Sequence, residues 1–269
     1  MQKHEERKDK HGARDALLVA GGLYLFSLLM GNRTPVLASG DAYSRAVLAS
    51  RPDFYYRHLE NAGVVAHDSS GNGNHGAYTG VVTLNQAGFI NYDPASRSIL
   101  LAGAGYVSVP QVVAGPALGN NWTYECSVSL AAYPAGSARL FSTNFGGNAD
   151  IGLAIGIDAT GHVFVGTEGV GVDLTGATAL AIGTDYYINV TQAIIAGSLT
   201  TSIYVNNVLD ARSASAGYAT YVNHWCIGVL DFNGTLAGFL DAHCSEEAFY
   251  KNGLSDADRA THYATWLAP

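Results

Sequence analysis

The chain of 269 residues has few charged side chains and lacks an excess of basic ones. Charged residues make up 13% of it, and 14 Lys and Arg stand against 22 Asp and Glu, a formal net charge of −8. A sequence-independent grip on a phosphate backbone needs clustered basic side chains. Nucleic acid is therefore not an expected partner.

Cysteine is also scarce, with Cys126, Cys226 and Cys244 alone in the chain. They form neither a C-x-x-C pair nor a dense set, which excludes a zinc site and a disulfide-stapled scaffold. A Cys226–Cys244 bridge would require an oxidising compartment. Buried free thiols are the favoured interpretation.

Motifs of catalysis are missing as well. The sequence contains no G-x-S-x-G, no H-E-x-x-H and no E-x-D-x-x-E. Glu246 and Glu247 are adjacent, so on a strand they point to opposite faces and cannot share a scissile bond. We expect a surface or capping role for this pair and no enzymatic activity for the chain.

Long apolar runs are limited to one segment, residues 16–31, whose sixteen residues fall short of the roughly 20 that cross a bilayer. It follows fifteen residues that carry five basic and four acidic side chains. A secretory signal cleaved before Ser39, a membrane anchor and an arm that docks into a larger assembly all fit this pattern. We expect residues 1–40 to be tail, anchor and linker. The expected anchoring side chains are Leu17, Leu18, Leu23, Phe26, Leu28 and Leu29.

The remainder, residues 41–269, is rich in Gly, Tyr and β-branched residues and alternates with period two. Many short strands with glycine-rich turns predict an all-β fold, a two-sheet antiparallel jelly-roll sandwich. The expected strands are Gly105–Pro110, Trp122–Leu130, Ala138–Thr143, Ile151–Asp158, His162–Thr167, Tyr186–Ala193, Thr200–Val205 and Trp225–Val229.

Turn and cap residues add detail to this prediction. Hairpin tips are expected at Asp158–Gly161 and at Asn206–Asn207, because these residues tolerate positive φ. A short helix is expected over residues 41–50. A short C-terminal helix over residues 259–267 should begin at a cap that includes Ser255.

The densest local signal is residues 68–76, DSSGNGNHG, which contains a formal G-x-G-x-x-G. No helix pattern follows it, so a dinucleotide site is not expected. Asp68, Ser70 and Asn72 resemble the start of a calcium loop, without the acid that an EF-hand needs at its twelfth position. Two interpretations stay open, an irregular calcium site and a tight turn in which Asp68 accepts backbone N–H groups.

Aromatic residues gather in a second segment, where Tyr218, Tyr221 and Trp225 surround Asn223 and His224 in an expected loop. Exposed aromatic rings stack on sugars, which makes the three aromatic residues candidates for glycan binding. Packing in a tyrosine-rich core is the competing interpretation.

Several segments carry a family resemblance: residues 55–88 with the DSSGNGNHG loop, residues 104–110, the WTYECSVSL segment with Glu125, residues 203–209 and residues 245–264. In order and spacing they resemble the laminin-G-like (concanavalin A-like) jelly-roll domains found in bacteriophage virion proteins. The resemblance covers roughly residues 45–267. Ser245 stands where the family often has an aspartate that helps to hold calcium.

The resemblance implies a non-catalytic structural or decoration protein on the virion surface. Residues 1–40 would bind other virion proteins, the sandwich would project outward and bind a host glycan, and copies would form a homo-oligomer. No cofactor is required, although calcium is possible. The alternative is a secreted or cell-surface carbohydrate-binding adhesin in which residues 1–38 are a signal or anchor.

Overall fold

The computed structural model describes residues 41–113, 118–143, 152–168, 170–215, 217–218, 225–232 and 234–267. The chain divides into residues 1–40 and a compact unit that runs from Asp41 to Pro269. All six expected anchoring residues, Leu17 to Leu29, lie outside the described residues, so their role stays a prediction.

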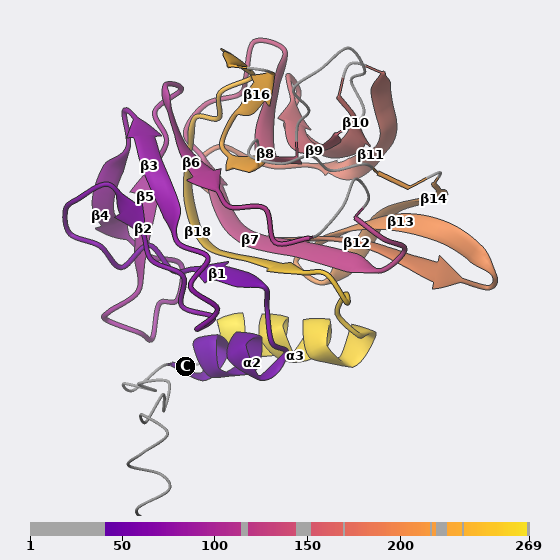
Figure 1. Cartoon of the computed structure of the whole chain (residues 1–269), viewed down its shortest axis with the longest axis horizontal. Helices are drawn as coiled ribbons and strands as arrows, with labels where there is room; N and C mark the ends of the chain where they lie inside the picture. Colours follow the sequence, from indigo (N-terminus) through magenta and orange to yellow (C-terminus); the bar gives the residue numbers. More distant parts are fainter. Residues whose placement is uncertain are drawn as a thin grey trace, which may run out of the picture. The chain divides into compact units, whose positions relative to one another are not determined.

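Two large antiparallel sheets form a β-sandwich, as the period-two pattern predicts (Figure 1). In the described part of the chain each sheet has eight strands. Sheet A runs in the order β14 (Val208–Ala214), β13 (Ser198–Val205), β12 (Asp185–Ile195), β7 (Trp122–Leu130), β18 (Ala242–Tyr250), β5 (Arg97–Leu100) and β4 (Thr83–Ala87), with β1 (Phe54–Tyr56) paired to β18. Sheet B runs in the order β11 (Gly171–Ala179), β10 (His162–Thr167), β9 (Leu153–Asp158), β8 (Ser137–Thr143), β15 (Trp225–Ile227), β6 (Gly105–Val109), β3 (Gly76–Gly80) and β2 (Val65–Ala66).

A small hairpin, β16 (Leu230–Phe232) with β17 (Thr235–Ala237), forms a separate two-stranded sheet. Between the sheets, the core is built on stacked and edge-packed aromatic rings. The ring of Phe141 stacks on that of Tyr124, with 4.7 Å between centroids, and meets Trp225 edge-on at 5.5 Å. Burial of such large rings supplies most of the stabilisation that a sandwich gains.

Two helices cover the outer face of sheet A, α2 (Ala42–Ala49) and α3 (Asp256–Leu267), and lie side by side there (Figure 1). Asp41 caps α2 by accepting from the Ser44 N–H at 2.7 Å, and Ser255 caps α3 by accepting from the Asp258 N–H at 3.1 Å. Because of this cover, every residue of β7 is buried, including the polar ones that alternate along it. Within the described ranges, neither helix is both long and apolar enough to span a membrane.

The expected strands are confirmed, with end points that shift by a few residues. Both hairpin tips are confirmed: the Gly161 N–H donates to the Asp158 carbonyl at 3.1 Å, and Asn206 and Asn207 have φ of 51° and 61°. The expectation of buried thiols is also confirmed, since Cys126, Cys226 and Cys244 are all buried and free. Strands β1 to β5 and β11 were not among the ranges expected from the sequence, whereas β14 is the second strand of the hairpin expected at Asn206–Asn207.

Candidate functional site

Trp225 and Tyr218 lie in the core, so for these two residues the core-packing interpretation is confirmed and the sugar-stacking interpretation is wrong. Trp225 sits on β15 in the interior of sheet B and packs edge-on against Phe249 at 5.2 Å between centroids. Tyr218 packs against Trp122 at 6.0 Å. Apolar burial outweighs exposure for rings of this size. Tyr221 lies outside the described residues, so its glycan-binding role stays a prediction.

The loop of residues 68–76 is a tight turn organised by Asp68, which is itself buried. One carboxylate oxygen, Oδ1, accepts from the Tyr55 N–H at 3.0 Å and the Ser70 N–H at 2.9 Å. The other, Oδ2, accepts from the Ser70 hydroxyl at 2.8 Å and the Asn74 N–H at 2.9 Å. Four donors match the roughly four lone-pair sites of a carboxylate. The loop is thereby tied to β1.

These contacts do not fit calcium. The Asn72 amide nitrogen donates to the Pro52 and Asp53 carbonyls, and the Ser245 hydroxyl donates to backbone carbonyls of Arg57 and Arg97. The Asp68 carboxylate has no lone pair left for a cation, and calcium takes six to eight oxygens. Within the described ranges, no group of three or more His, Cys, Asp and Glu side chains is placed to hold a metal.

We expect Asp68→Ala to lower the free energy of unfolding by about 2–3 kcal/mol, because it leaves backbone donors without their charged acceptor. Excess EDTA should leave the thermal transition of the unaltered protein in place, and added calcium should not raise it. Calorimetry on metal-stripped and calcium-loaded protein measures both. A calcium-dependent rise that Asp68→Ala abolishes would instead make the loop a cation site.

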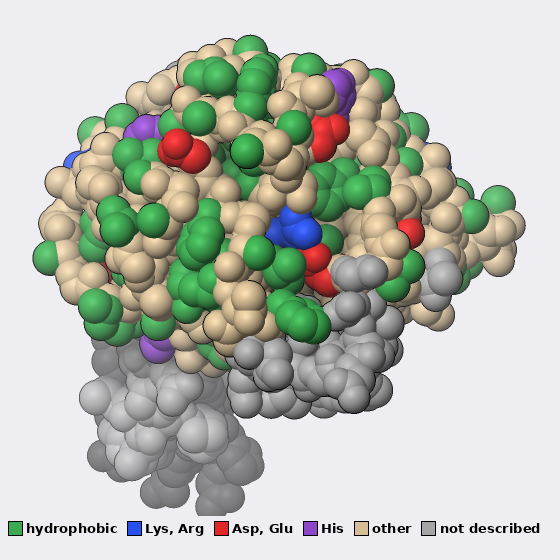
Figure 2. Space-filling model, turned by 90° about the horizontal axis from the view of Figure 1, so that it is seen from above, with side chains coloured by type: hydrophobic (Ala, Val, Ile, Leu, Met, Phe, Trp, Pro, Cys, Tyr) green, Lys and Arg blue, Asp and Glu red, His purple; other side chains and the backbone are tan. Residues whose placement is uncertain are grey.

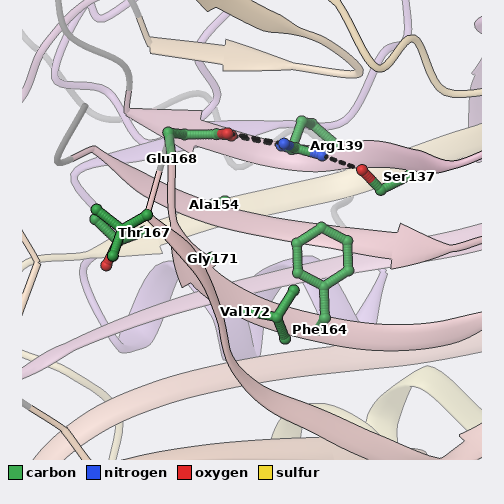
Figure 3. Close-up of a pocket in the computed structure, with 9 residues that line it drawn as sticks. Ser137, Arg139, Ala154, Phe164, Thr167, Glu168, Gly171 and Val172 are labelled. Atoms are coloured by element: carbon green, nitrogen blue, oxygen red, sulfur yellow. Dashed lines mark hydrogen bonds and ion pairs between the residues drawn. The ribbon is translucent and has the colours of Figure 1, made fainter.

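A hollow of about 260 Å³ opens on the outer face of sheet B, over β8 to β11, and is hereafter the sheet B hollow (Figure 3). Outward-facing side chains of these strands line it, because alternate residues such as Leu140, Ile155 and Val163 point into the core. Its lining is Ser137, Arg139, Ala154, Phe164, Thr167, Glu168, Val170, Gly171 and Val172.

An ion pair forms one side of the hollow. The Glu168 carboxylate accepts from both Nε and Nη2 of Arg139, the latter at 2.7 Å, in a two-pronged arrangement. The Arg139 Nη1 donates to the Ser137 hydroxyl at 3.0 Å. Glu168 is buried and Arg139 nearly so, and together they form the polar side of the hollow. Figure 3 shows the contacts of Arg139 with Glu168 and with Ser137 along one edge of the hollow.

Apolar side chains form the other side. Figure 3 places Phe164 and Val172 opposite the ion pair, with Ala154 and Gly171 between them. The Phe164 ring lies directly over Gly156, where a Cβ atom would come within 2.6 Å of two ring carbons, so only glycine fits beneath it. The Arg139 guanidinium stands 5.4 Å from the ring centroid on the polar side.

Sequence reasoning did not find this site. Arg139 is the one charged residue of β8, and Glu168 directly follows β10, which is a weak signal for an outward-facing polar pair. The two residues are 29 positions apart, and only the order of β8, β9 and β10 in sheet B brings them together. Figure 2 looks onto this side of the described unit, where hydrophobic and uncharged side chains prevail and charged ones are scattered.

Buried carboxylates form a second group of polar residues, and here the sequence prediction needs a correction. Glu246 and Glu247 are both fully buried and have no surface or capping role. A bulge in β18, with Glu246 at φ 58°, parts the two side chains. Glu246 accepts from the Tyr55 hydroxyl, and Glu247 lies 2.7 Å from Nε2 of His58.

A hollow of similar volume, about 260 Å³, lies beside β2 and is lined by residues that include His58, Glu60 and His67. The Glu60 carboxylate accepts from the His67 N–H at 2.8 Å and from the Tyr78 hydroxyl at 2.7 Å. Burial acts to raise the pKa of Glu60, but these hydrogen bonds outweigh it and lower that pKa. Its carboxylate is thus occupied by protein donors.

Comparison with protein-family models gives no match, and comparison with curated protein sequences gives none either. Among solved structures, the fold is similar to domain 4 of AbnA, a GH43 extracellular arabinanase from Geobacillus stearothermophilus, in complex with arabinotriose. That match has a TM-score of 0.59 and 14% identity, and it covers 79% of this chain and 98% of that one.

Two further structures share the fold. Trypanosoma rangeli sialidase, in complex with the inhibitor DANA, matches with a TM-score of 0.54 and 15% identity over 78% of this chain. The botulinum neurotoxin serotype C1 binding domain matches with a TM-score of 0.59 and 12% identity over 82% of this chain. The chain spans 32% of the sialidase and 53% of the toxin domain. At these identities the likeness establishes a jelly-roll β-sandwich.

Proposed function

We propose that this chain is a non-catalytic carbohydrate-binding domain and that the sheet B hollow is its sugar site. The proposal rests on the two-sided lining of the hollow, in which the Arg139–Glu168 pair lies across from the exposed Val172 side chain, beside the buried Phe164 ring. Sugars present hydroxyl groups on their rim and C–H groups on their faces, which suit a polar wall opposite an apolar one. The hollow lies on sheet B, whereas α2 and α3 cover the outer face of sheet A.

One of the similar structures supports this proposal through its printed ligand, since the arabinanase domain holds arabinotriose, a neutral sugar. A non-catalytic role is supported by the chemistry of the hollow. Hydrolysis of a glycosidic bond generally uses two carboxyl groups that flank it. Among the described residues that line the hollow, Glu168 is the single acid, and Arg139 holds both of its oxygens.

The setting that the family resemblance implies is the surface of a virion, with residues 1–40 bound to other virion proteins and the sandwich displayed as one of several copies. The alternative setting is a secreted or cell-surface adhesin. The mass and location of the native chain distinguish them. A full-length chain in purified particles supports the virion setting, and a chain that starts at Ser39 in the secreted fraction supports the adhesin.

Val172→Arg tests the sugar site directly. Val172 is 58% exposed at the rim of the hollow, so arginine there should fill the hollow and add a charge without disturbing the core. We expect sugar binding, measured on a glycan array and by calorimetry with the best-bound glycan, to fall at least tenfold. The free energy of unfolding should change by less than about 0.5 kcal/mol, as for most surface substitutions.

Val208→Arg is the matched control, because Val208 is 69% exposed and lies on β14 in sheet A. The same chemical change there should leave binding intact. Equal binding by the two variants would place the sugar site elsewhere.

A further inference from the structure

The charges of the sheet B hollow are balanced within the protein. Arg139 is the single cation and Glu168 the single anion among the described residues that line it. Arg139 and Glu168 form a bidentate contact, which is the geometry in which a guanidinium also binds the carboxylate of a ligand. Glu168 therefore already occupies the position that the carboxylate of an acidic sugar would take.

The remaining donors of Arg139 suit neutral acceptors. A guanidinium has five N–H groups, and contacts with Glu168 and Ser137 use three of them. In the described part of the structure, two N–H groups are left for a ligand oxygen. A sugar hydroxyl can accept from them and at the same time donate to a Glu168 lone pair. A ligand carboxylate cannot donate, and it would lie beside the carboxylate of Glu168.

A further acid strengthens this discrimination. The Asp173 carboxylate accepts from the hydroxyl of Thr167, a lining residue, at 3.3 Å. Asp173 follows Val172 on β11, so its side chain points to the opposite face of that strand and its charge acts on the hollow from behind the rim. The chain as a whole carries a formal charge of −8. Approach of an anionic ligand is thus disfavoured both near the hollow and at a distance.

The volume of the hollow sets the size of the ligand. About 260 Å³ lies just below the range of roughly 300 to 1,000 Å³ that is typical of sites for drug-sized molecules. It suits one sugar ring, whose C–H face would lie on the exposed Val172 side chain while its hydroxyls meet the ion pair. Longer glycans would extend out of the hollow.

We infer that the sheet B hollow selects a neutral sugar ring and rejects its acidic counterpart. This inference rests on the proposed function and narrows its ligand to neutral sugars. The ion pair between Arg139 and Glu168 is the specificity-determining feature, because it cancels the charge that would attract an acidic sugar.

The test uses the full-length chain and an array of matched pairs, glucose with glucuronic acid, galactose with galacturonic acid and mannose with mannuronic acid. We expect the unaltered protein to bind a neutral member at least tenfold more tightly than its acidic partner. That affinity should stay within twofold between low and high salt, because no net charge is involved. Glu168→Gln should free the guanidinium and lower the neutral-to-acidic ratio at least tenfold.

Glu60→Gln is the control, since it makes the same chemical change in the hollow beside β2 and should leave the ratio unaltered. The inference would be overturned if the unaltered protein bound the acidic members as tightly as the neutral ones or more tightly, with an affinity that falls as salt is added. The proposed sugar site would still be tested separately by Val172→Arg. The salt series requires no variant, so a Glu168→Gln protein that fails to fold does not block the test. If no array sugar binds in a Val172-dependent way, the proposed function itself is wrong.

Discussion

Replacing Glu125 by alanine should lower the free energy of unfolding by about 3–5 kcal/mol, the usual cost of breaking a buried ion pair. Glu125 lies on β7, fully buried under α3. Its carboxylate accepts from the hydroxyls of Tyr187 and Tyr250, the latter at 2.6 Å, and lies 3.1 Å from Nδ1 of His262. Alanine would leave two buried hydroxyls and one imidazole without their common acceptor.

The pKa values indicate that this pair is charged. Burial acts to raise the pKa of Glu125, but the His262 imidazolium and the hydrogen bonds outweigh burial and lower it. Burial acts to lower the pKa of His262, but the Glu125 carboxylate outweighs burial and raises it. His262 also contacts the Ala46 carbonyl at 3.1 Å and the Ser50 hydroxyl at 2.9 Å, so the pair joins β7, α2 and α3.

The sign of each shift sets the pH at which this measurement belongs. A raised His262 pKa stabilises the fold fully below its unfolded value of about 6.5, and that stability is lost as the pH rises through the folded value. A lowered Glu125 pKa stabilises the fold above about 4.3, and that stability is lost as the pH falls through the folded value. Denaturant unfolding near pH 5.5 therefore measures the complete pair.

His67→Ala is the control for this experiment. His67 also pairs with a glutamate, with Nδ1 at 2.9 Å from Glu60, but its side chain is 65% exposed. An exposed pair contributes little, so we expect a loss below about 1 kcal/mol. A similarly small loss for Glu125→Ala would show that the layer under the helices contributes little to stability.

This polar layer shows why the sequence predicted the strands and not their surroundings. Residues 122–130 alternate between apolar and polar side chains, which is typical of a strand with one solvent-exposed face. The polar face is in fact buried, because α2 and α3 cover Glu125, Ser127 and Thr123. Local periodicity carries no information on which distant helix packs over a strand, so the buried role of Glu125 could not be predicted.

The candidate site follows the same rule. Asp68 was predictable as a turn residue, because all four of its donors lie within thirteen positions of it. The Arg139–Glu168 pair depends on strand order, which the pattern of residues leaves open. Trp225 was predicted to begin a strand, and it does, but the polar residues before it suggested an exposed ring, whereas its strand is central in sheet B and the ring is buried.

Glu246→Gln should remove a pH dependence from the stability of this protein. Burial, opposed by Arg57 and the Tyr55 hydroxyl and assisted by the charges of Asp41 and Glu247, raises the pKa of Glu246 to about 7. The Arg57 guanidinium is a weak partner because its Nη2 contacts Asp41 and Asp93, and its Nε stands 3.6 Å from Glu246.

The sign of the expected change follows from proton binding. Between about pH 4.5 and 7 the folded protein holds a proton on Glu246 that the unfolded chain has released, so the free energy of unfolding falls as the pH rises. At about 1.4 kcal/mol per unit, this window amounts to about 3 kcal/mol. Glutamine carries no charge at any pH and should abolish this part of the fall. Relative to the unaltered protein, Glu246→Gln should therefore gain about 3 kcal/mol between pH 5 and 8.

Urea unfolding at closely spaced pH values measures this gain, and Glu60→Gln again serves as the control. Because the pKa of Glu60 is lowered, its contribution to stability changes below pH 5, and its curve should run parallel to that of the unaltered protein from pH 5 to 8. The raised pKa of His262, to which neither Glu60 nor Glu246 contributes, adds a fall above about pH 6.5 that all three proteins share. Parallel curves for Glu246→Gln and the unaltered protein would mean that Glu246 is ionised throughout this range, with Arg57 as a full ionic partner despite the 3.6 Å separation.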